Sequence, residues 1–158
     1  MQNCDVLLAV GARFEALRRE LIAKPRDRDE LALEIRKMRR KMHDGHPNRS
    51  KQFDLKHDSG GMVDTEFIVQ YLVLGSSHQV PALLDNAGNI ALLGRAAKAG
   101  LIDAQRAQRV ADAYRGYRRR QHAMRLQGKT YARVEPGEVA AEREQVRLLW
   151  QETLGDQP

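Results

Sequence analysis

Residues 56–75, KHDSGGMVDTEFIVQYLVLG, decide the fold of this chain. From Phe67 to Leu74 every residue except Gln70 is apolar or aromatic. A helix with apolar side chains around nearly its whole circumference lies in the interior of a protein. The sequence therefore predicts a central buried helix over about residues 61–74. The first part of the segment is different, because it carries a lysine, two adjacent glycines and several carboxylates.

The segments on both sides show apolar residues at three- and four-residue spacing, the period of an amphipathic helix. Two stripes precede the central helix: Val6, Val10, Phe14, Leu17 and Leu21, then Leu31, Ile35, Met38 and Met42. Pro25 separates them, and Asp27 or Asp29 can cap the second helix. Further helices are predicted from Asn86 or Asn89 to Gly100, from Asp103 to about Gln127, and from about Gly137 to Leu154. We therefore predict an all-α bundle of five to six helices.

Residues 52–56 are the only segment that predicts extended structure. They are short, alternate between polar and apolar side chains, and are flanked by polar sequence. A lone strand needs a partner, and no other stretch of the sequence resembles one. At most one short extended segment is therefore expected.

Length, composition and charge limit the class of protein. The 158 residues make about one domain, and we predict a single helical domain over residues 1–158. The single Cys4 excludes an internal disulfide framework, and no apolar run approaches the roughly 20 residues that span a membrane. The start of the chain lacks the pattern of a signal peptide. These features predict a soluble, cytoplasmic protein that does not contact a membrane.

The net charge of +6 permits an anionic partner without selecting one. Much of the excess lies in residues 36–57, where a solvated helix face followed by a polar loop is the favoured interpretation. A second basic stretch, YRGYRRRQH at residues 114–122, mixes aromatic residues with arginine in a way that can bind RNA. Tyr114 and Tyr117 fall on the apolar stripe of their helix, however, so no nucleic-acid partner is expected.

The stretch from Lys56 to Asp64 allows two interpretations. A glycine pair at the start of a helix can leave backbone N–H groups free to bind an anion, with Lys56 reaching a phosphate and Asp58 or Asp64 holding Mg²⁺. Alternatively, Ser59 or Gly61 caps the helix and Asp64 complements its dipole. No phosphate-binding loop of a known pattern is present. Both interpretations remain open at this point.

Glu66 lies within the most apolar helix, one turn before Gln70. A buried carboxylate must be paired or must face a cleft, because burying it alone is costly. A salt bridge to an arginine of a neighbouring helix and a cleft-facing position are both compatible with the sequence. The histidines His43, His46 and His57 do not match the spacing of a zinc site, so no metal ligands are predicted.

Residues 53–74, FDLKHDSGGMVDTEFIVQYLVL, resemble the signature of the bacterial glutamine synthetase adenylyltransferase, also called the adenylyl-removing enzyme. The family pattern is approximately F-D-[IL]-K-x-x-x-G-G-[IM]-x-D-I-E-F-[IL]-x-Q-Y-L-V-L. Four other segments resemble the family in the same order: EIRKMRRKM (34–42), DNAGNIALLGRAAKAGLI (85–102), AYRGYRRRQHAMRLQG (113–128) and AEREQVRLLWQETLG (141–155). The resemblance therefore covers essentially the whole chain.

This resemblance implies a function that composition does not. The family's enzymes are large and bifunctional: one half transfers AMP from MgATP to a tyrosine of glutamine synthetase, and the other removes it by phosphorolysis. The PII signal protein and glutamine regulate the balance. The chain resembles the C-terminal helical domain that follows the adenylylating nucleotidyltransferase core, so it is expected to be a fragment of a multidomain enzyme. Its implied partners are that core, glutamine synthetase and the PII protein, and its implied cofactors are ATP and Mg²⁺ in the full-length enzyme.

One absence limits what the resemblance carries over. The family's catalytic core has a G-S-x-[DE]-x-D pattern whose carboxylates bind metal ions, and LGSSHQV at residues 74–80 lacks the carboxylate pair. Phosphoryl transfer depends on such ligands. We therefore expect this chain alone to be inactive, with no catalytic residue and no tightly bound cofactor.

The resemblance nevertheless implies residues at the nucleotide. Lys56, Gly60, Gly61, Asp64 and Glu66 are expected to bind nucleotide or to face the cleft between domains. Thr65 stands where the family usually has isoleucine, and Gly88-Asn89 replaces a pair that includes arginine. The alternative function is a non-catalytic module that docks the PII protein or glutamine synthetase.

Overall fold

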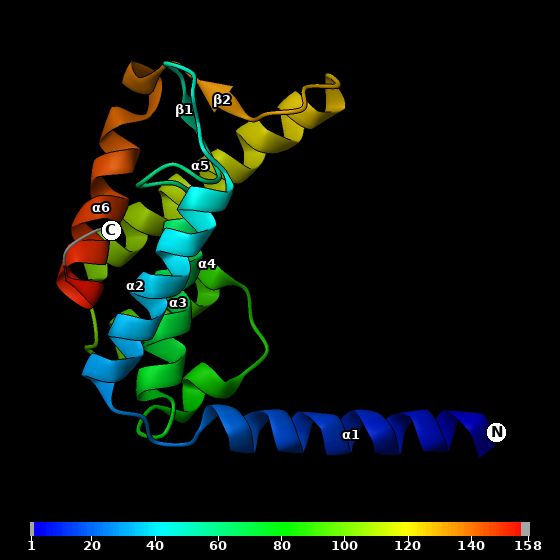
Figure 1. Cartoon of the computed structure of the whole chain (residues 1–158). Helices are drawn as coiled ribbons and strands as arrows, with labels where there is room; N and C mark the ends of the chain where they lie inside the picture. The colour runs from blue at the N-terminus through cyan, green and yellow to red at the C-terminus, as the bar shows by residue number, and fades with distance from the viewer. Residues whose placement is uncertain (1, 156–158) are drawn as a thin grey trace.

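The computed structural model describes residues 2–155, with side chains from residue 9 onward. Its six α-helices are α1 (Gln2–Ile22), α2 (Arg28–Gly45), α3 (Met62–Ser76), α4 (Asn89–Lys98), α5 (Ala104–Leu126) and α6 (Ala140–Leu154). Two short 3-10 helices, η1 (Pro81–Leu84) and η2 (Pro136–Val139), and two strands, β1 (Phe53–Asp54) and β2 (Arg133–Val134), complete the described part of the chain. The predicted all-α bundle is confirmed (Figure 1).

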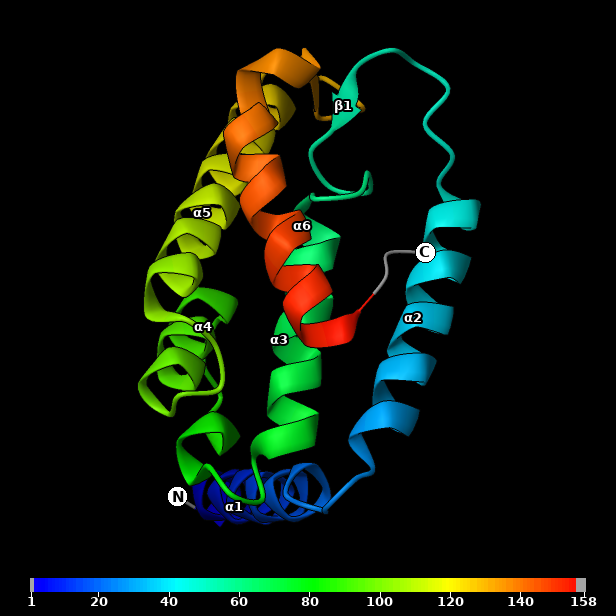
Figure 2. The same cartoon turned by 90° about the vertical axis from the view of Figure 1, so that its left-hand side faces the viewer.

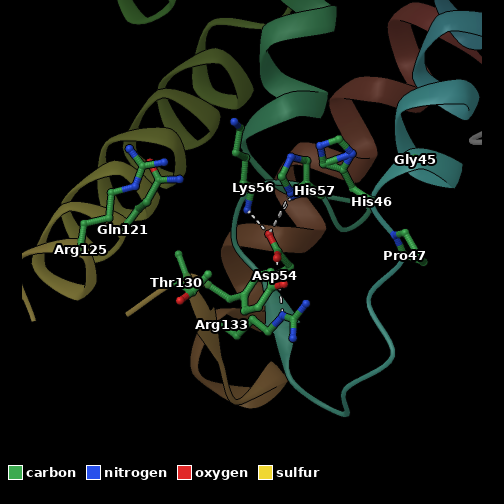
Figure 3. Close-up of a pocket in the computed structure, with 12 residues that line it drawn as sticks. Gly45, His46, Pro47, Asp54, Lys56, His57, Gln121, Arg125, Thr130 and Arg133 are labelled. Atoms are coloured by element: carbon green, nitrogen blue, oxygen red, sulfur yellow. Dashed lines mark hydrogen bonds and ion pairs between the residues drawn. The ribbon is translucent and has the colours of Figure 1, made fainter. Parts of the chain in front are cut away.

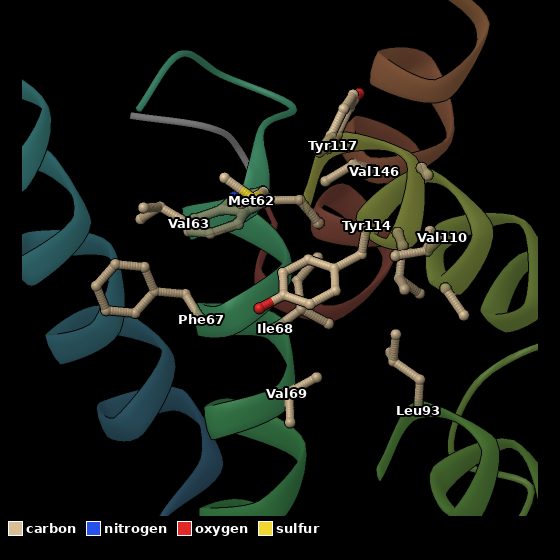
Figure 4. Close-up of a cluster of buried hydrophobic side chains, with 14 of the residues drawn as sticks. Met62, Val63, Phe67, Ile68, Val69, Leu93, Val110, Tyr114, Tyr117 and Val146 are labelled. Atoms are coloured by element: carbon tan, nitrogen blue, oxygen red, sulfur yellow. The ribbon is translucent and has the colours of Figure 1, made fainter. Parts of the chain in front are cut away.

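Helix α3 is the central buried helix, as predicted. It packs against α2, α4, α5 and α6, and Figure 2 shows α6 crossing beside it between α5 and α2. Ile68 and Leu72 of α3 are almost fully buried, as are Val110, Tyr117 and Trp150 of the neighbouring helices. Figure 4 shows the α3 side chains meeting those of α4 and α5. Burial of this apolar surface is the main stabilising term of the fold.

The helix ends follow the capping chemistry of the sequence. The Asp27 side chain accepts hydrogen bonds from the Asp29 and Glu30 N–H groups at the start of α2. Asp103 accepts one from the Arg106 N–H at the start of α5. Such caps satisfy N–H groups that have no partner within the helix. Of the two aspartates that could cap α2, Asp27 is the N-cap, and Asp103 is the N-cap of α5 at the predicted start of that helix.

The prediction of at most one extended segment was wrong. Strand β1 pairs antiparallel with β2, with Phe53 opposite Val134 and Asp54 opposite Arg133. The Leu55 N–H adds a hydrogen bond of 2.9 Å to the Ala132 carbonyl. A two-residue strand carries no recognisable alternation, so its partner could not be found in the sequence. The pairing joins the loop before α3 to the segment between α5 and α6.

Helix α1 extends away from the end of the bundle (Figure 1). Its predicted stripe does share one face, but that face is exposed: Val10, Phe14, Leu17 and Leu21 are 45–67% exposed. Val6, the first residue of the stripe, lies outside the residues whose side chains are described. The end of α1 is fixed to the body of the domain by the hydrogen bond of 3.0 Å from the Ser77 hydroxyl to the Ile22 carbonyl.

The stripe predicted for α2 is only partly buried. Ile35 packs in the core and Leu31 lies against it, whereas Met38 and Met42 are exposed. The buried position between them is Arg39, an arginine 3% exposed that pairs with α3. Across residues 2–155 no helix has the combination of length and apolar character that crossing a membrane requires.

Candidate functional site: a basic pocket beside the loop before α3

Two aspartates fold the β1–α3 loop, residues 55–61, into a fixed turn. The Asp54 carboxylate accepts the N–H groups of Lys56 (2.9 Å) and His57 (3.0 Å). The Asp58 carboxylate accepts the Asp54 N–H (2.8 Å) and the Asn48 side-chain amide (2.7 Å). Asn and Asp side chains commonly stabilise turns by such local bonds. Lys56 is therefore displayed from a backbone whose conformation is set on both sides.

The glycine pair allows close packing, and its backbone N–H groups are used within the loop. The Gly60 N–H is donated to the Asp64 carboxylate (2.6 Å) and the Gly61 N–H to the Asp58 carbonyl (2.9 Å). Both glycines are buried, and Gly60 has φ of +88°, a conformation that favours glycine. The interpretation that these two N–H groups are free to bind an anion is not supported. Gly61 is the N-cap residue of α3, as the capping alternative proposed.

Asp64 faces into the protein and connects three segments. It is 2% exposed and forms an ion pair with the buried Arg39 of α2. Arg39 in turn donates a hydrogen bond of 2.9 Å to the His57 carbonyl. Burial raises the pKa of the Asp64 carboxyl, while Arg39 and the Gly60 N–H act in the opposite direction. Asp64 thus holds the β1–α3 loop against α2 and α3.

Among the described residues Glu66 forms no salt bridge to an arginine, which was one of the two positions left open by the sequence; it is hydrogen-bonded to a tyrosine instead. Its carboxylate is half-buried and accepts a hydrogen bond of 3.0 Å from the Tyr114 hydroxyl of α5. The same hydroxyl accepts one of 3.0 Å from the Asn89 side-chain amide of α4. Burial raises the pKa of Tyr114. This chain of hydrogen bonds ties α3, α4 and α5 together.

The two inward-facing tyrosines of α5 are expected to respond in opposite ways to loss of the hydroxyl. Tyr114→Phe removes two hydrogen bonds, one of them to a carboxylate, and is expected to lower the free energy of unfolding by about 1–2 kcal/mol. Within residues 2–155 the buried Tyr117 hydroxyl has no hydrogen-bond partner. Tyr117→Phe is therefore expected to leave stability unchanged or to raise it by up to about 1 kcal/mol. Urea unfolding of both variants checks this, and a larger loss in Tyr117→Phe than in Tyr114→Phe contradicts it.

A pocket of about 430 Å³ lies beside the β1–α3 loop (Figure 3). Its walls come from the end of α2, the β1–α3 loop, the last turns of α5 and the segment that enters β2. Lys56, Arg125 and Arg133 supply three cations from three of these segments, and Gln121 and Thr130 add uncharged polar groups. We call this cavity the basic pocket. Of the predicted site residues, Lys56 alone lines it.

Two histidines and one carboxylate complete the wall of the basic pocket. The His46 and His57 rings lie 4.3 Å apart between centroids, and His57 Nδ1 lies 3.6 Å from Asp54. Burial, followed by the charge of His46, lowers the pKa of His57. Asp54 also lies 3.6 Å from the Arg133 Nε. In the described part of the chain no group of three His, Cys, Asp or Glu side chains could hold a metal ion.

Sequence reasoning missed Arg125 and Arg133 as residues of this site. Arg125 follows the arginines of residues 115–120 along α5 and differs from them in no local sequence feature. Arg133 reaches the pocket only because β2 pairs with β1. Residues 131–134, YARV, show no alternation from which a strand could be predicted.

Comparison with known proteins assigns the class. The fold is a helical bundle, and residues 31–134, well over half of the chain, match the family model described as GlnD PII-uridylyltransferase. The chain therefore belongs to that family. Its curated relatives are called bifunctional glutamine synthetase adenylyltransferase/adenylyl-removing enzyme, which confirms the resemblance found in residues 53–74.

Three of these relatives show the extent of the match. The relative from Bordetella bronchiseptica is 54% identical over 148 residues, and that from Aromatoleum aromaticum is 52% identical over 146 residues. The relative from Nitrosomonas europaea is 43% identical over 159 residues. Each match covers 92% of this chain but only 16–17% of the relative. The chain thus spans about one-sixth of the length of these enzymes.

Proposed function

We propose that this chain is the helical accessory domain of a glutamine synthetase adenylyltransferase, the domain that follows the adenylylating nucleotidyltransferase core. In that enzyme AMP passes from ATP, with Mg²⁺, to a tyrosine of glutamine synthetase, and the PII signal protein regulates the reaction. The identity of 51–54% over 92% of the chain to relatives of that name is the observation that carries the proposal. The domain contributes to nucleotide binding from outside the catalytic core.

Within this function, Lys56 contacts the phosphates of the nucleotide. Its side chain lines the basic pocket, and no Asp or Glu of the described residues forms an ion pair with it. A lysine ammonium is a common ligand of phosphate groups. Gly60, Gly61 and Asp64 brace the loop that carries Lys56, and Glu66 braces the helix behind it.

The test uses a chimera, in which this chain replaces the matching 148 residues of the Bordetella bronchiseptica relative. In the chimera, Lys56→Ala is expected to lower kcat/KM for ATP about tenfold, which corresponds to a loss of roughly 1.4 kcal/mol of binding free energy. AMP transfer to glutamine synthetase is measured at varied ATP concentration. Lys51→Ala is the matched control, because it removes the same positive charge from an exposed lysine of the same loop region. If only the net charge mattered, kcat/KM would fall equally in both variants.

The outcome separates this function from the alternative. A module that only docks a protein predicts that Lys56→Ala leaves both kcat and KM for ATP unchanged, and that result would overturn the role given to Lys56. An equal loss in Lys51→Ala would show that the effect is one of net charge rather than of the pocket.

A further inference from the structure

The charges of the basic pocket are not balanced within it. Asp54 is its only carboxylate; it is 6% exposed, lies in contact with Arg133 and His57, and accepts two backbone N–H groups of the loop. Within the described residues, neither Lys56 nor Arg125 has a carboxylate partner. The pocket therefore combines three permanent positive charges with one negative charge, and that carboxylate already has partners in Arg133, His57 and the loop backbone.

Arg133 is the third cation of the basic pocket. Its Nε is buried and lies 3.6 Å from the Asp54 carboxylate, so contact with a ligand in the pocket falls to the two terminal nitrogens of the guanidinium. The guanidinium also lies over the Tyr131 ring, 4.2 Å from its centroid, which holds its plane in place.

We propose that the basic pocket binds a linear polyphosphate group, with Arg125 and Arg133 as binding residues in addition to Lys56. This inference rests on the proposed function for its source of ligand. Transfer of the adenylyl group from ATP to a tyrosine hydroxyl breaks the bond between the α-phosphorus and its bridging oxygen. It releases pyrophosphate, and the hydroxyl proton passes to solvent. The β- and γ-phosphates of ATP and the released pyrophosphate both consist of two linked phosphate groups, so each is a ligand of this class.

The shape of the pocket favours this class over a single phosphate. About 430 Å³ falls within the range of small-molecule sites and exceeds what one tetrahedral anion occupies. Figure 3 shows Arg125 and Lys56 entering from different elements, with Arg133 on the other side of Asp54. One arginine guanidinium can donate two N–H groups to the oxygens of one phosphate group. Cations from separate segments can therefore bind different phosphate groups of one polyphosphate.

Calorimetric titration of the full 158-residue chain with four probes tests the proposal: pyrophosphate, ATP, AMP and inorganic phosphate. Pyrophosphate and ATP are expected to bind at least tenfold more tightly than AMP and phosphate, and more weakly as salt rises. Both probes are expected to bind; a higher affinity for pyrophosphate identifies the released product as the preferred ligand, and a higher affinity for ATP identifies the substrate. Equal affinity for all four probes, or no binding of pyrophosphate, would overturn the proposal.

Arg125 is the residue to substitute first, because it is exposed and its loss does not disturb packing. Arg125→Ala is expected to weaken pyrophosphate binding about tenfold and Arg125→Lys by less, whereas Arg119→Ala, exposed on the same helix outside the pocket, leaves it unchanged. Arg133→Lys keeps the charge but removes the paired terminal N–H donors of the guanidinium and should also weaken binding. Unaltered affinity in Arg125→Ala would contradict the proposal. These titrations need no catalytic activity, so they can fail while the Lys56 test succeeds, and the reverse.

Discussion

Asp64→Ala is expected to lower the free energy of unfolding of this chain by about 3–5 kcal/mol, the cost of breaking a buried ion pair by removing one partner. Arg39 would remain 3% exposed with no negative charge beside it. The Gly60 N–H would also lose its acceptor. A domain of this size is stable by only about 5–15 kcal/mol, so the loss should be evident in urea or thermal unfolding.

Two control variants show whether the effect belongs to the buried pair. Glu144→Ala removes a carboxylate from a surface pair with Arg147, and its expected cost is below about 0.5 kcal/mol. The double variant Arg39→Met with Asp64→Leu removes both buried charges and should recover part of the stability lost in Asp64→Ala; the Gly60 N–H and the His57 carbonyl still lack the partners they have in the original chain. A cost below about 1 kcal/mol in Asp64→Ala would mean that the pair does not hold the β1–α3 loop.

Gly60→Ala is expected to cost about 3 kcal/mol, from backbone strain and from overpacking together. Gly60 has φ of +88°, which residues with a side chain rarely adopt. An added Cβ would lie 2.5 Å from the Arg143 Cγ and 2.8 Å from the Arg143 carbonyl oxygen. The backbone oxygen cannot move aside as a side chain can, so the loop or α6 must shift.

Gly116→Ala is the matched control for this glycine. Gly116 lies within α5, has ordinary helical backbone angles, and an added Cβ there meets nothing within 4 Å. Alanine in a helix interior is about 0.5–1 kcal/mol more favourable than glycine, so this variant should be more stable than the original chain. Equal and small effects in the two variants, measured by urea unfolding, would contradict the close packing of the β1–α3 loop on α6.

The parts of the fold that depend on local chemistry could be predicted from the sequence. The apolar circumference of residues 67–74 marked the central helix, and the capping aspartates Asp27 and Asp103 marked two helix starts. It could not show that the stripe of α1 is exposed, because periodicity identifies a shared face and not what covers it. The extended segment predicted over residues 52–56 contains β1, but its partner β2 was missed because a two-residue strand shows no pattern.

The site was predicted only in part, for a related reason. Lys56 was identified from its place beside the glycine pair and does line the basic pocket. Asp64 was taken as a residue that could face the nucleotide, yet it pairs with Arg39, which is 25 residues distant and lies next to Arg40 in a basic stretch, residues 36–41. Arg39 lies one helical turn after the buried Ile35, but only the packing of α2 on α3 shows that an arginine at this position is buried.

The most direct test of the account is AMP transfer to glutamine synthetase by the chimera with the Bordetella bronchiseptica relative. We expect the relative without its matching 148 residues to transfer no AMP, the chimera to regain transfer, and this chain alone to show none. Circular dichroism establishes that each protein is folded. A folded chimera without activity, or measurable ATP-dependent transfer by this chain alone, would contradict the proposal that this chain is the helical accessory domain of that enzyme.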